Sequence, residues 1–288
     1  MIYGKLRLWL ESMRSSTMLR KITHNETQEY LNNGVVMLPR VFSMAWIEYL
    51  RDATEVAMAN PGPHGEEYAK GNGRFFGDLD VAKRQAPFKN FIHQSPAAQI
   101  IGTIMASNNV NFFYDQLLVK ERSTGDKTPW HQDQPYWAVK GFQVASIWLP
   151  LDAVSKDTSL QYVKGSHRWN AYNPHHFSDN TPYEGTGLPE LPDIDAEPDK
   201  YKILAWNMKP GDCLVFQAMI VHGSAGNPSS SNRRRAYSTR WTGDDARYKH
   251  ITGEVAIPTS NPGLIDGAKM DCKDFPLIWK NPQENFYL

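Results

Sequence analysis

Residues 209–227 read KPGDCLVFQAMIVHGSAGN, and this stretch decides the fold. It opens with a sharp Pro-Gly-Asp turn, and the apolar run 213–221 that follows is typical of a buried strand. His222 ends the run and is followed at once by a glycine and by Ser224. A histidine at the end of an apolar strand is expected at the rim of a β-sandwich or barrel rather than in a solvated loop.

Strand-like runs continue on both sides of this stretch, separated by clusters of Gly, Pro, Ser or Asn. They cover residues 110–121, 142–151, 160–163, 212–221 and 235–242. Helical patterns precede them at 23–32, 44–59 and 95–106, with a short strand at 35–38. We therefore expect a mainly β fold, a sandwich or barrel with the N-terminal helices packed outside. Residues 23–288 are predicted to form a single domain, which a polar insertion at 169–201 interrupts.

The first 22 residues differ in character from the rest. Five basic side chains and one acidic side chain alternate with Leu, Met and Trp. An amphipathic organellar transit peptide, a docked helix, and sequence upstream of a true start at Met18 all agree with this pattern. We favour an N-terminal extension, residues 1–22, without a targeting role, and we expect a cytoplasmic protein.

Composition narrows the functional classes. The 288 residues carry 31 Lys and Arg against 31 Asp and Glu, so no basic excess favours a nucleic-acid partner. No apolar stretch approaches the length of a membrane span, so no membrane partner is expected. The two cysteines, Cys213 and Cys272, form neither a metal-binding pair nor a disulfide framework, which indicates a reducing compartment. We expect a small-molecule substrate and either a monomer or a homodimer.

Three of the nine histidines begin a His-x-acid triplet. The triplet His131-Gln132-Asp133 follows a strand-like run, and side chains two apart in an extended chain point to the same side. With His222 from a distant strand, His131 and Asp133 give a set of two histidines and one carboxylate. This set on one face of an octahedron leaves three positions open, as in non-haem Fe(II) oxygenases. Zn²⁺ accepts the same ligands.

Arg233 lies eleven residues after His222, just before a strand-like run. A 2-oxoglutarate cosubstrate chelates iron with its keto-acid end and presents a second carboxylate about 5 Å further into the barrel. A planar guanidinium binds that carboxylate in a bidentate manner, and the Ser224 hydroxyl adds a bond. Strand alternation sends Arg233 and Arg235 to one side and Arg234 to the other. The spacing from His222 favours Arg233 for this role.

The chain resembles the phytanoyl-CoA dioxygenase family of Fe(II)/2-oxoglutarate-dependent oxygenases. The similar segments come in the family order and read QEYLNNGVV at 28–36, WHQD at 130–133, WLPLD at 148–152, VKGSHR at 163–168, KPGD at 209–212 and HGSAGN at 222–227. The likeness extends from about residue 23 to Trp241. The motif around Trp130 and Trp137 is most similar to that of ectoine hydroxylases, although the rest of their substrate motif has no counterpart here.

The resemblance implies a double-stranded β-helix, a distorted jelly roll of the cupin kind with helices packed outside. It also implies that His131, Asp133 and His222 bind iron and that Arg233 binds 2-oxoglutarate. Further residues at positions near the cosubstrate are Ser224, Gln132, Trp148, Gln116 and Leu118. Halogenases of this group replace the carboxylate by a small residue, so Asp133 favours hydroxylation.

Candidates for a substrate pocket are Tyr136, Trp137, Arg240, Phe76 and Trp241. The aromatic side chains are equally expected as core residues, and Arg240 equally as a surface salt-bridge partner. Residues 74–80, charged and aromatic after a glycine-rich loop, are a candidate mobile lid. We expect His167 to be structural and the pair His175-His176 to be solvated.

The expected function is an Fe(II)/2-oxoglutarate-dependent dioxygenase that uses O2 to hydroxylate an aliphatic C–H bond of a small metabolite or natural-product intermediate, releasing succinate and CO2. Two alternatives remain open. One is a zinc-dependent hydrolase or cupin-like isomerase with the same triad, which has no use for a dicarboxylate-binding arginine. The other is a catalytically inactive barrel that only binds a ligand.

Overall fold

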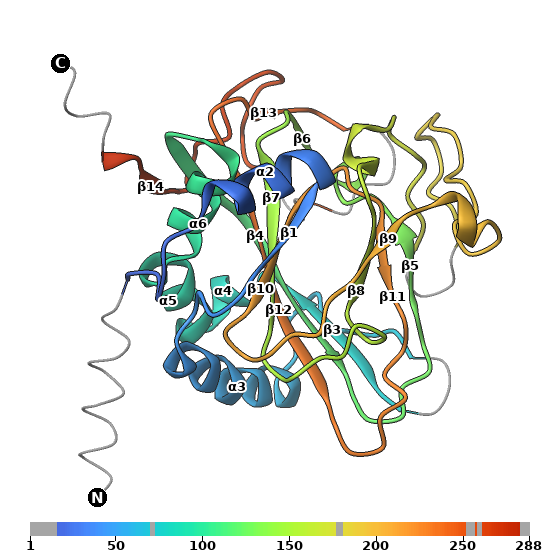
Figure 1. Cartoon of the computed structure of the whole chain (residues 1–288). Coiled ribbons are helices and arrows are strands. Elements are labelled where there is room, and N and C mark those ends of the chain that lie inside the picture. The colour runs from blue at the N-terminus through green and yellow to red at the C-terminus, as the bar shows by residue number, and fades with distance from the viewer. Residues whose placement is uncertain (1–15, 70–72, 177–180, 252–256, 258–260, 283–288) are drawn as a thin grey trace, which may run out of the picture.

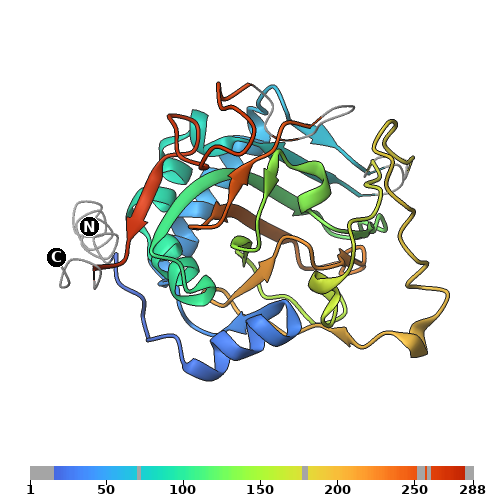
Figure 2. The same cartoon turned by 90° about the horizontal axis from the view of Figure 1, so that it is seen from above.

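A computed structural model of the chain describes residues 16–69, 73–176, 181–251, 257 and 261–282 (Figure 1). Its centre is a large sheet with the strand order β1-β10-β7-β12-β4-β3-β2, and β14 also pairs with β4. A four-stranded sheet has the order β5-β11-β8-β9, and β13 and β6 form a separate pair. Seen from above, the strands surround a common interior (Figure 2). The predicted mainly β fold, a double-stranded β-helix, is confirmed.

The elements have the following bounds. The large sheet contains β1 (Val35–Leu38), β2 (Glu66–Glu67), β3 (Phe75–Leu79), β4 (Asn109–Lys120), β7 (Val144–Pro150), β10 (Cys213–Gln217), β12 (Arg234–Thr242) and β14 (Leu277–Lys280). The small sheet contains β5 (Thr128–His131), β8 (Leu160–Val163), β9 (Ile203–Leu204) and β11 (His222–Ser224), and the separate pair is β6 (Val139–Lys140) and β13 (Arg247–Tyr248). The helices are α2 (His24–Asn33), α3 (Met44–Ala59), α4 (Val81–Arg84), α5 (Ala86–Gln94) and α6 (Ala97–Met105), with 3-10 turns η1 (Gln134–Tyr136), η2 (Ser166–Arg168) and η3 (Pro198–Lys200).

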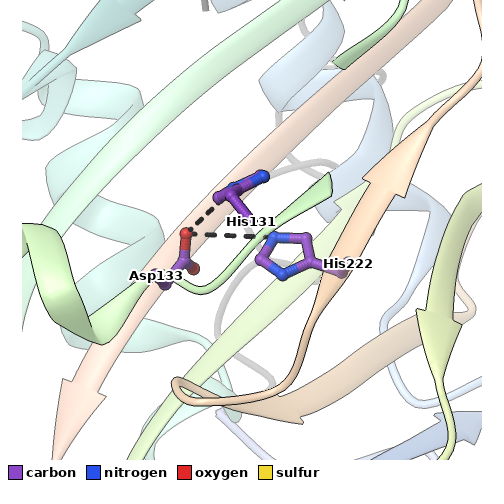
Figure 3. A group of neighbouring side chains, drawn as sticks. All are labelled: His131, Asp133 and His222. Atoms are coloured by element: carbon purple, nitrogen blue, oxygen red, sulfur yellow. Dashed lines mark ion pairs between the residues drawn. The ribbon is translucent and has the colours of Figure 1, made fainter. Parts of the chain in front are cut away.

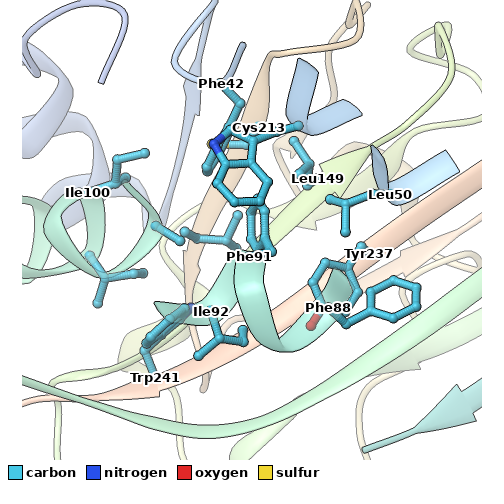
Figure 4. Packing of buried hydrophobic residues seen from close by; sticks show 14 of the residues in the cluster. Phe42, Leu50, Phe88, Phe91, Ile92, Ile100, Leu149, Cys213, Tyr237 and Trp241 are labelled. Carbon is cyan, nitrogen blue, oxygen red and sulfur yellow. The ribbon is translucent and has the colours of Figure 1, made fainter. Parts of the chain in front are cut away.

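Alternation along the large sheet divides its side chains between two environments. Odd-numbered residues of β7 and β12, such as Leu149 and Tyr237, face the helices and share a core with Leu50 of α3 and Phe91 of α5 (Figure 4). Even-numbered residues, such as Trp148 of β7, belong to a second cluster inside the barrel. This alternation decides which side chains can reach a ligand in the interior.

The three predicted helices are confirmed as α2, α3 and α6. Helix α2 begins after Thr23, which forms the expected capping box with Glu26. Helices α4 and α5 were not predicted, and α5 carries Pro87 in its first turn, where proline is tolerated. Within the described residues, no helix is long and apolar enough to cross a membrane. Residues 1–15 of the predicted extension lie outside the described residues.

Two segments differ from the expectations. The candidate lid, residues 74–80, is wrong as a lid: β3 pairs along β4 in the large sheet, and Phe75 and Phe76 are 2% and 1% exposed. The apolar run 213–221 does not form one strand that ends at His222. Strand β10 stops at Gln217, the chain turns, and His222 begins β11 in the other sheet. The histidine therefore reaches the interior from the small sheet.

Gly34 ends helix α2 with a left-handed backbone (φ +83°), which glycine adopts without steric cost. A Cβ at this position would lie 2.5 Å from Nδ1 of His167, which packs against the turn. We expect Gly34→Ala to lower the free energy of unfolding by about 1–3 kcal/mol, measured by urea denaturation. Gly125→Ala is the control, because a Cβ at that position would have no atom within 4 Å, and it should change stability by less than about 0.5 kcal/mol. Equal stabilities of the two variants would contradict this account of the turn.

Candidate functional site

His131, Asp133 and His222 converge inside the barrel (Figure 3). Strands β5 and β11 are neighbours in the small sheet, and His131 and His222 are direct partners in their register. Asp133 Oδ1 lies 3.4 Å from Nε2 of His131 and 3.8 Å from Nε2 of His222. The three side chains are 6%, 6% and 4% exposed in sequence order. One ion can therefore contact a ligand atom of each residue.

The convergence of His131 and Asp133 has a different origin from the expected one. The two residues do not lie on a continuous extended strand, because Asp133 has helical backbone angles (φ −74°, ψ −46°) and precedes the 3-10 turn η1. Its backbone N–H donates to the carbonyl of Ala218 in the turn before β11, at 3.0 Å. This bond ties the carboxylate to the same turn that leads into His222.

Hydrogen bonds fix the orientation of both imidazoles. Nδ1 of His131 lies 2.8 Å from the carbonyl oxygen of Pro129, and Nδ1 of His222 lies 3.1 Å from that of Ile220. A carbonyl oxygen only accepts, so each Nδ1 carries the hydrogen and each Nε2 presents its lone pair to the group. This is the usual second-layer arrangement of a metal-binding histidine.

The electrostatics of the group suit a cation. Burial, together with the charge of His131, lowers the pKa of His222 to about 4, so its imidazole is neutral at neutral pH. Burial alone would raise the pKa of Asp133, but the adjacent His222 and His131 lower it to about 2, so the carboxylate is ionised. Two imidazoles and one carboxylate form a facial set that fits Fe(II) and leaves positions open for other ligands. The same donors also accept zinc.

The structure does not bring Arg233 to this group. Its guanidinium lies on the helix-facing side, with Nη1 2.6 Å from Oε1 of Glu55 in α3 and Nη2 2.7 Å from Oε1 of Glu121. Arg235 points the same way and shares Glu55 while pairing with Asp152. The three arginines alternate between the two sides of the strand, as expected. The choice of Arg233 from its spacing to His222 was wrong, because Arg233 lies on the side that faces away from the interior.

Arg234 is the arginine that enters the barrel. It is 6% exposed, and its Nη2 lies 3.4 Å from Oγ of Ser224, two residues after His222 of β11. Lys120, its register partner on β4, is fully buried and places Nζ 3.2 Å from the same hydroxyl. Ser224 in turn donates to the hydroxyl of Thr128 at 3.1 Å. Lys120 was not among the predicted residues, although it shares the inward phase of Gln116 on β4.

These two basic side chains lack a counter-charge. Across the described part of the chain, no carboxylate lies within ion-pairing distance of Arg234 or Lys120, which instead donate to Ser224 and to backbone carbonyls of Thr158, Asp126 and Ala225. Burial lowers the pKa of Arg234 to about 10, and burial together with the charge of Arg234 lowers the pKa of Lys120 to about 6. Buried cations are normally paired, so this place favours an anion.

The other residues expected near the cosubstrate divide into two groups. Trp148 and Leu118 share the inward phase of the large sheet, and Gln116 lines a cavity beside Asp133. Gln132 has a structural role instead: its amide donates to the carbonyls of Asn170 and Met219 and accepts from the N–H of Tyr172. The backbone turns into η1 directly after Gln132, and this side chain therefore points towards the insertion at residues 169–201.

A cavity of about 460 Å³ lies beside Asp133. The predicted substrate residues Tyr136 and Trp137 line it, whereas Phe76 and Trp241 point the other way, into the core beneath the helices. The pair His175-His176 was expected to be solvated; both residues are partly exposed and line the cavity, where His175 also pairs with Glu190. His167 contacts the carbonyl of Leu31 at the end of α2, in agreement with a structural role.

Arg240 is a buried neighbour of this cavity rather than a surface salt-bridge partner. It is 5% exposed, donates from Nη2 to Oε1 of Gln116 at 2.9 Å, and lies over the ring of Tyr114 at 4.7 Å. Its charge helps to lower the pKa of Asp133. Arg240 therefore contacts two residues that line the cavity, Gln116 and Tyr114, and its Nε has no hydrogen-bond partner within the described residues.

A jelly-roll barrel with a buried pair of histidines and one carboxylate is the arrangement of the mononuclear non-haem metal oxygenases. The family model described as phytanoyl-CoA dioxygenase (PhyH) matches residues 30–236. The chain belongs to the phytanoyl-CoA dioxygenase family.

Curated relatives agree with this membership. The chain is 25% identical over 157 residues to a probable phytanoyl-CoA dioxygenase of Caenorhabditis elegans, a match that covers 51% of this chain and 47% of that protein. It is 24% identical over 163 residues to an ectoine dioxygenase of Nocardia farcinica, with 52% and 53% covered. The chain thus spans about half the length of the curated relatives it matches.

Solved structures show the same fold. The carbocyclase SnoK of nogalamycin biosynthesis, described as non-haem and α-ketoglutarate-dependent, has a TM-score of 0.70 at 18% identity, covering 91% of this chain and 98% of its own. The epimerase SnoN of the same biosynthesis has a TM-score of 0.69 at 18% identity, with 89% and 98% covered. EctD from S. alaskensis has a TM-score of 0.63 at 16% identity, with 88% and 86% covered.

Proposed function

We propose that this protein is an Fe(II)/2-oxoglutarate-dependent dioxygenase that hydroxylates an aliphatic C–H bond of a small molecule. The reaction consumes one O2 and one 2-oxoglutarate for each substrate and yields the alcohol, succinate and CO2. One observation carries the proposal: Arg234 and Lys120, two buried basic side chains without a carboxylate partner among the described residues, meet at Ser224 beside the two-histidine, one-carboxylate group.

The metal-ligating residues in this proposal are His131, Asp133 and His222. Bound Fe(II) would supply the redox chemistry that couples O2 to decarboxylation of 2-oxoglutarate and to attack on the C–H bond. The chain keeps both imidazoles in the metal-binding tautomer through Pro129 and Ile220. Burial of the whole group excludes bulk water, which favours the coupled reaction over side reactions.

The dicarboxylate is oriented by residues on both sheets. His222 and Ser224 lie two apart on β11, so their side chains point to the same side with Cα atoms about 6.6 Å apart. This separation is similar to the distance between the two ends of 2-oxoglutarate. We assign the distal carboxylate to Arg234, with Lys120 and the Ser224 hydroxyl as further donors, and not to Arg233.

Lys120 makes cosubstrate binding depend on pH. Its amine has a pKa of about 6 in the free protein and is mostly neutral at pH 7.5. A bound carboxylate raises that pKa, so 2-oxoglutarate binding takes up a proton and weakens as the pH rises above about 6, by up to about tenfold per pH unit. Calorimetry of the anaerobic Fe(II) protein in buffers of different ionisation enthalpy counts the protons. We expect uptake at pH 7.5 that disappears in Lys120→Met, and its absence from the unmodified protein would contradict the assignment.

The anion site also weighs against the alternatives. A zinc hydrolase or isomerase needs the triad but not two buried basic groups beside it. The structural neighbours named epimerase and carbocyclase show that related barrels serve different outcomes, and hydroxylation is proposed here because Asp133 completes the triad. The proposal is tested by incubating the protein with Fe(II), 2-oxoglutarate and O2 and following succinate by mass spectrometry. Iron-dependent succinate supports it, and consumption of no 2-oxoglutarate by iron-loaded protein contradicts it.

A further inference from the structure

Arg240 is a buried cation on the inner side of the large sheet. It lies six positions after Arg234 on β12 and shares its side of the strand. Its register partners are Tyr114 on β4 and Ser146 on β7. Tyr114 lines the cavity beside Asp133, and Oγ of Ser146 lies 3.5 Å from Oδ2 of Asp133. Arg240 therefore lies at the same level of the barrel as Asp133, next to the cavity.

Among the described residues, only neutral groups accept hydrogen bonds from this guanidinium. Nη2 donates to Oε1 of Gln116 at 2.9 Å, and Nη1 donates to the carbonyl of Ser238 at 3.2 Å. Nε is buried without a partner, and no carboxylate of the described part of the chain lies within ion-pairing distance. Arg240 is 5% exposed, and a charge buried to this extent is normally paired. Its surroundings therefore lack an anion.

Two carboxyl groups act on Arg240 from a greater distance, and neither matches its charge. Asp133 lies within electrostatic range, but in the proposed function its charge is matched by the metal ion. Asp115 points to the helix-facing side of β4, where it accepts from the hydroxyl of Tyr237 and from the N–H of Ala82. Burial raises the pKa of Asp115 to about 7, so this group is partly protonated at neutral pH.

The loaded centre leaves positive charge unmatched. In the proposed function, the two charges of Fe(II) are matched by Asp133 and by the keto-acid carboxylate of 2-oxoglutarate, and Arg234 is matched by the distal carboxylate. The proton that Lys120 takes up and the charge of Arg240 have no counterpart. Among the described residues that line the cavity, the one further carboxylate is that of Glu66, which is exposed. An anion in the cavity is therefore attracted to the centre.

The outer part of the cavity also offers donors to an anion. His64, His175 and His176 line it and are partly exposed. An imidazole carries at least one N–H donor in both its neutral and its protonated form. His175 already pairs in this way with the carboxylate of Glu190. An anionic ligand therefore meets hydrogen-bond donors on its way to the buried centre.

We infer that the cavity binds a substrate that carries an anionic group, in the simplest case a carboxylate, and that Arg240 binds this group. The inference rests on the proposed function for the statement that the bound molecule is the substrate. A carboxylate forms two charge-assisted hydrogen bonds with the fork of a guanidinium. Gln116, which holds Nη2, lines the cavity, so the incoming group replaces a neutral acceptor and also reaches the unpartnered Nε.

Matched pairs of an acid and its amide test the charge, because the two members have nearly the same shape. The pairs are benzoate and benzamide, 2-naphthoate and 2-naphthamide, and octanoate and octanamide. Binding is measured by anaerobic equilibrium dialysis with protein saturated with Fe(II) and 2-oxoglutarate. We expect the acid of at least one pair to bind at least about fivefold more tightly than its amide. A smaller preference in all three pairs would overturn the inference.

Two variants assign the preference to Arg240. Arg240→Met removes the guanidinium, and Gln116→Glu places a carboxylate of nearly the same shape beside it. Each should lower the preference for the acid to less than about twofold. Arg247→Met is the matched control, because Arg247 is a half-buried arginine that donates to backbone carbonyls and does not line the cavity. A full preference in folded Gln116→Glu protein would overturn the inference even if Arg240→Met does not fold.

The keto-acid carboxylate of 2-oxoglutarate is the other source of a carboxylate near Arg240, and a titration separates the two sources. Arg240→Met should raise the dissociation constant for 2-oxoglutarate less than about tenfold, because in our assignment it removes a nearby charge and no direct partner. A larger increase would assign Arg240 to the cosubstrate and overturn the inference.

The two proposals fail separately. A preference for the acid that depends on Arg240, together with no iron-dependent use of 2-oxoglutarate, would sustain the cavity inference and remove the proposed reaction. Iron-dependent succinate formation without a preference for the acid in any pair would do the reverse.

Discussion

Replacing His131 by alanine should lower the affinity for Fe(II) at least about 100-fold and abolish iron-dependent use of 2-oxoglutarate. Loss of a second-layer partner alone costs about 10- to 100-fold in metal affinity, and His131 is proposed as one of three direct ligands. The vacant position lies in a buried site, 3.4 Å from Asp133, and no other histidine of the described residues approaches the group besides His222. Anaerobic equilibrium dialysis with Fe(II) measures the effect.

Two further variants make this result interpretable. Asp133→Asn keeps the shape of the side chain and removes its charge, so it should also lose the metal while preserving the packing. His24→Ala removes an exposed histidine at the start of α2 and should bind Fe(II) normally. Circular dichroism verifies the fold of each protein. Full iron binding by a folded Asp133→Asn and a folded His131→Ala protein would contradict the proposed metal site.

The second large effect separates two adjacent arginines. Arg234→Met should raise the dissociation constant for 2-oxoglutarate about 30- to 1000-fold, because a buried charge-assisted hydrogen-bonded pair loses one partner. Arg233→Met should change it less than about threefold, since this side chain is paired with Glu55 and Glu121 on the helix-facing side. Titration of 2-oxoglutarate into the anaerobic Fe(II) proteins gives both constants.

The comparison is well controlled, because each variant removes one guanidinium and the two positions are adjacent at the start of β12. Arg233→Met loses partly exposed ion pairs and is expected to cost no more than about 1 kcal/mol of stability. A large loss of affinity in Arg233→Met with none in Arg234→Met would restore the assignment from residue spacing. A zinc hydrolase would be indifferent to both changes.

Local patterns in the sequence were sufficient for the mainly β class and for the capping box at Thr23. They also selected His131, Asp133 and His222, which do converge, but the extended-strand argument for His131 and Asp133 was wrong because Asp133 has helical backbone angles. The double-stranded β-helix was implied by the family resemblance. The predictions of one domain over residues 23–288 and of a cytoplasmic location stay predictions.

The proposed cosubstrate site could not be predicted from residue spacing alone. Counting from His222 selects Arg233, but the sequence alone does not give the path of the loop between them. The position of each arginine in the strand alternation decides which one is inside. The helix-facing residues Tyr237 and Trp241 differ from Arg233 by even steps, which is the signal that Arg233 shares their side. On β4, Lys120 lies four positions after Gln116. The two side chains therefore share a side of the strand, and the alternation indicates Lys120 as an interior residue. The sequence shows which residues of β4 and β12 share a side. It does not show which side faces the interior, because this depends on where the helices pack.

The insertion at 169–201 is the least predictable part of the site. Its polar composition indicates solvent exposure, yet His175, His176 and Tyr183 line the cavity. No periodic pattern marks them, because the segment is irregular and its place is set by contacts with η1, such as the hydrogen bond from the Tyr136 hydroxyl to the carbonyl of His175. Contacts of this kind become visible only in the folded chain.

The most direct test of the central claim is an anaerobic optical titration. Fe(II) and 2-oxoglutarate are added to the purified protein, and the weak visible charge-transfer band of a chelated keto acid is recorded. The account predicts a band that is absent in His131→Ala and that requires much more 2-oxoglutarate in Arg234→Met than in Arg233→Met. Folded, iron-loaded protein that gives no band would contradict the oxygenase proposal and bring the zinc alternative forward.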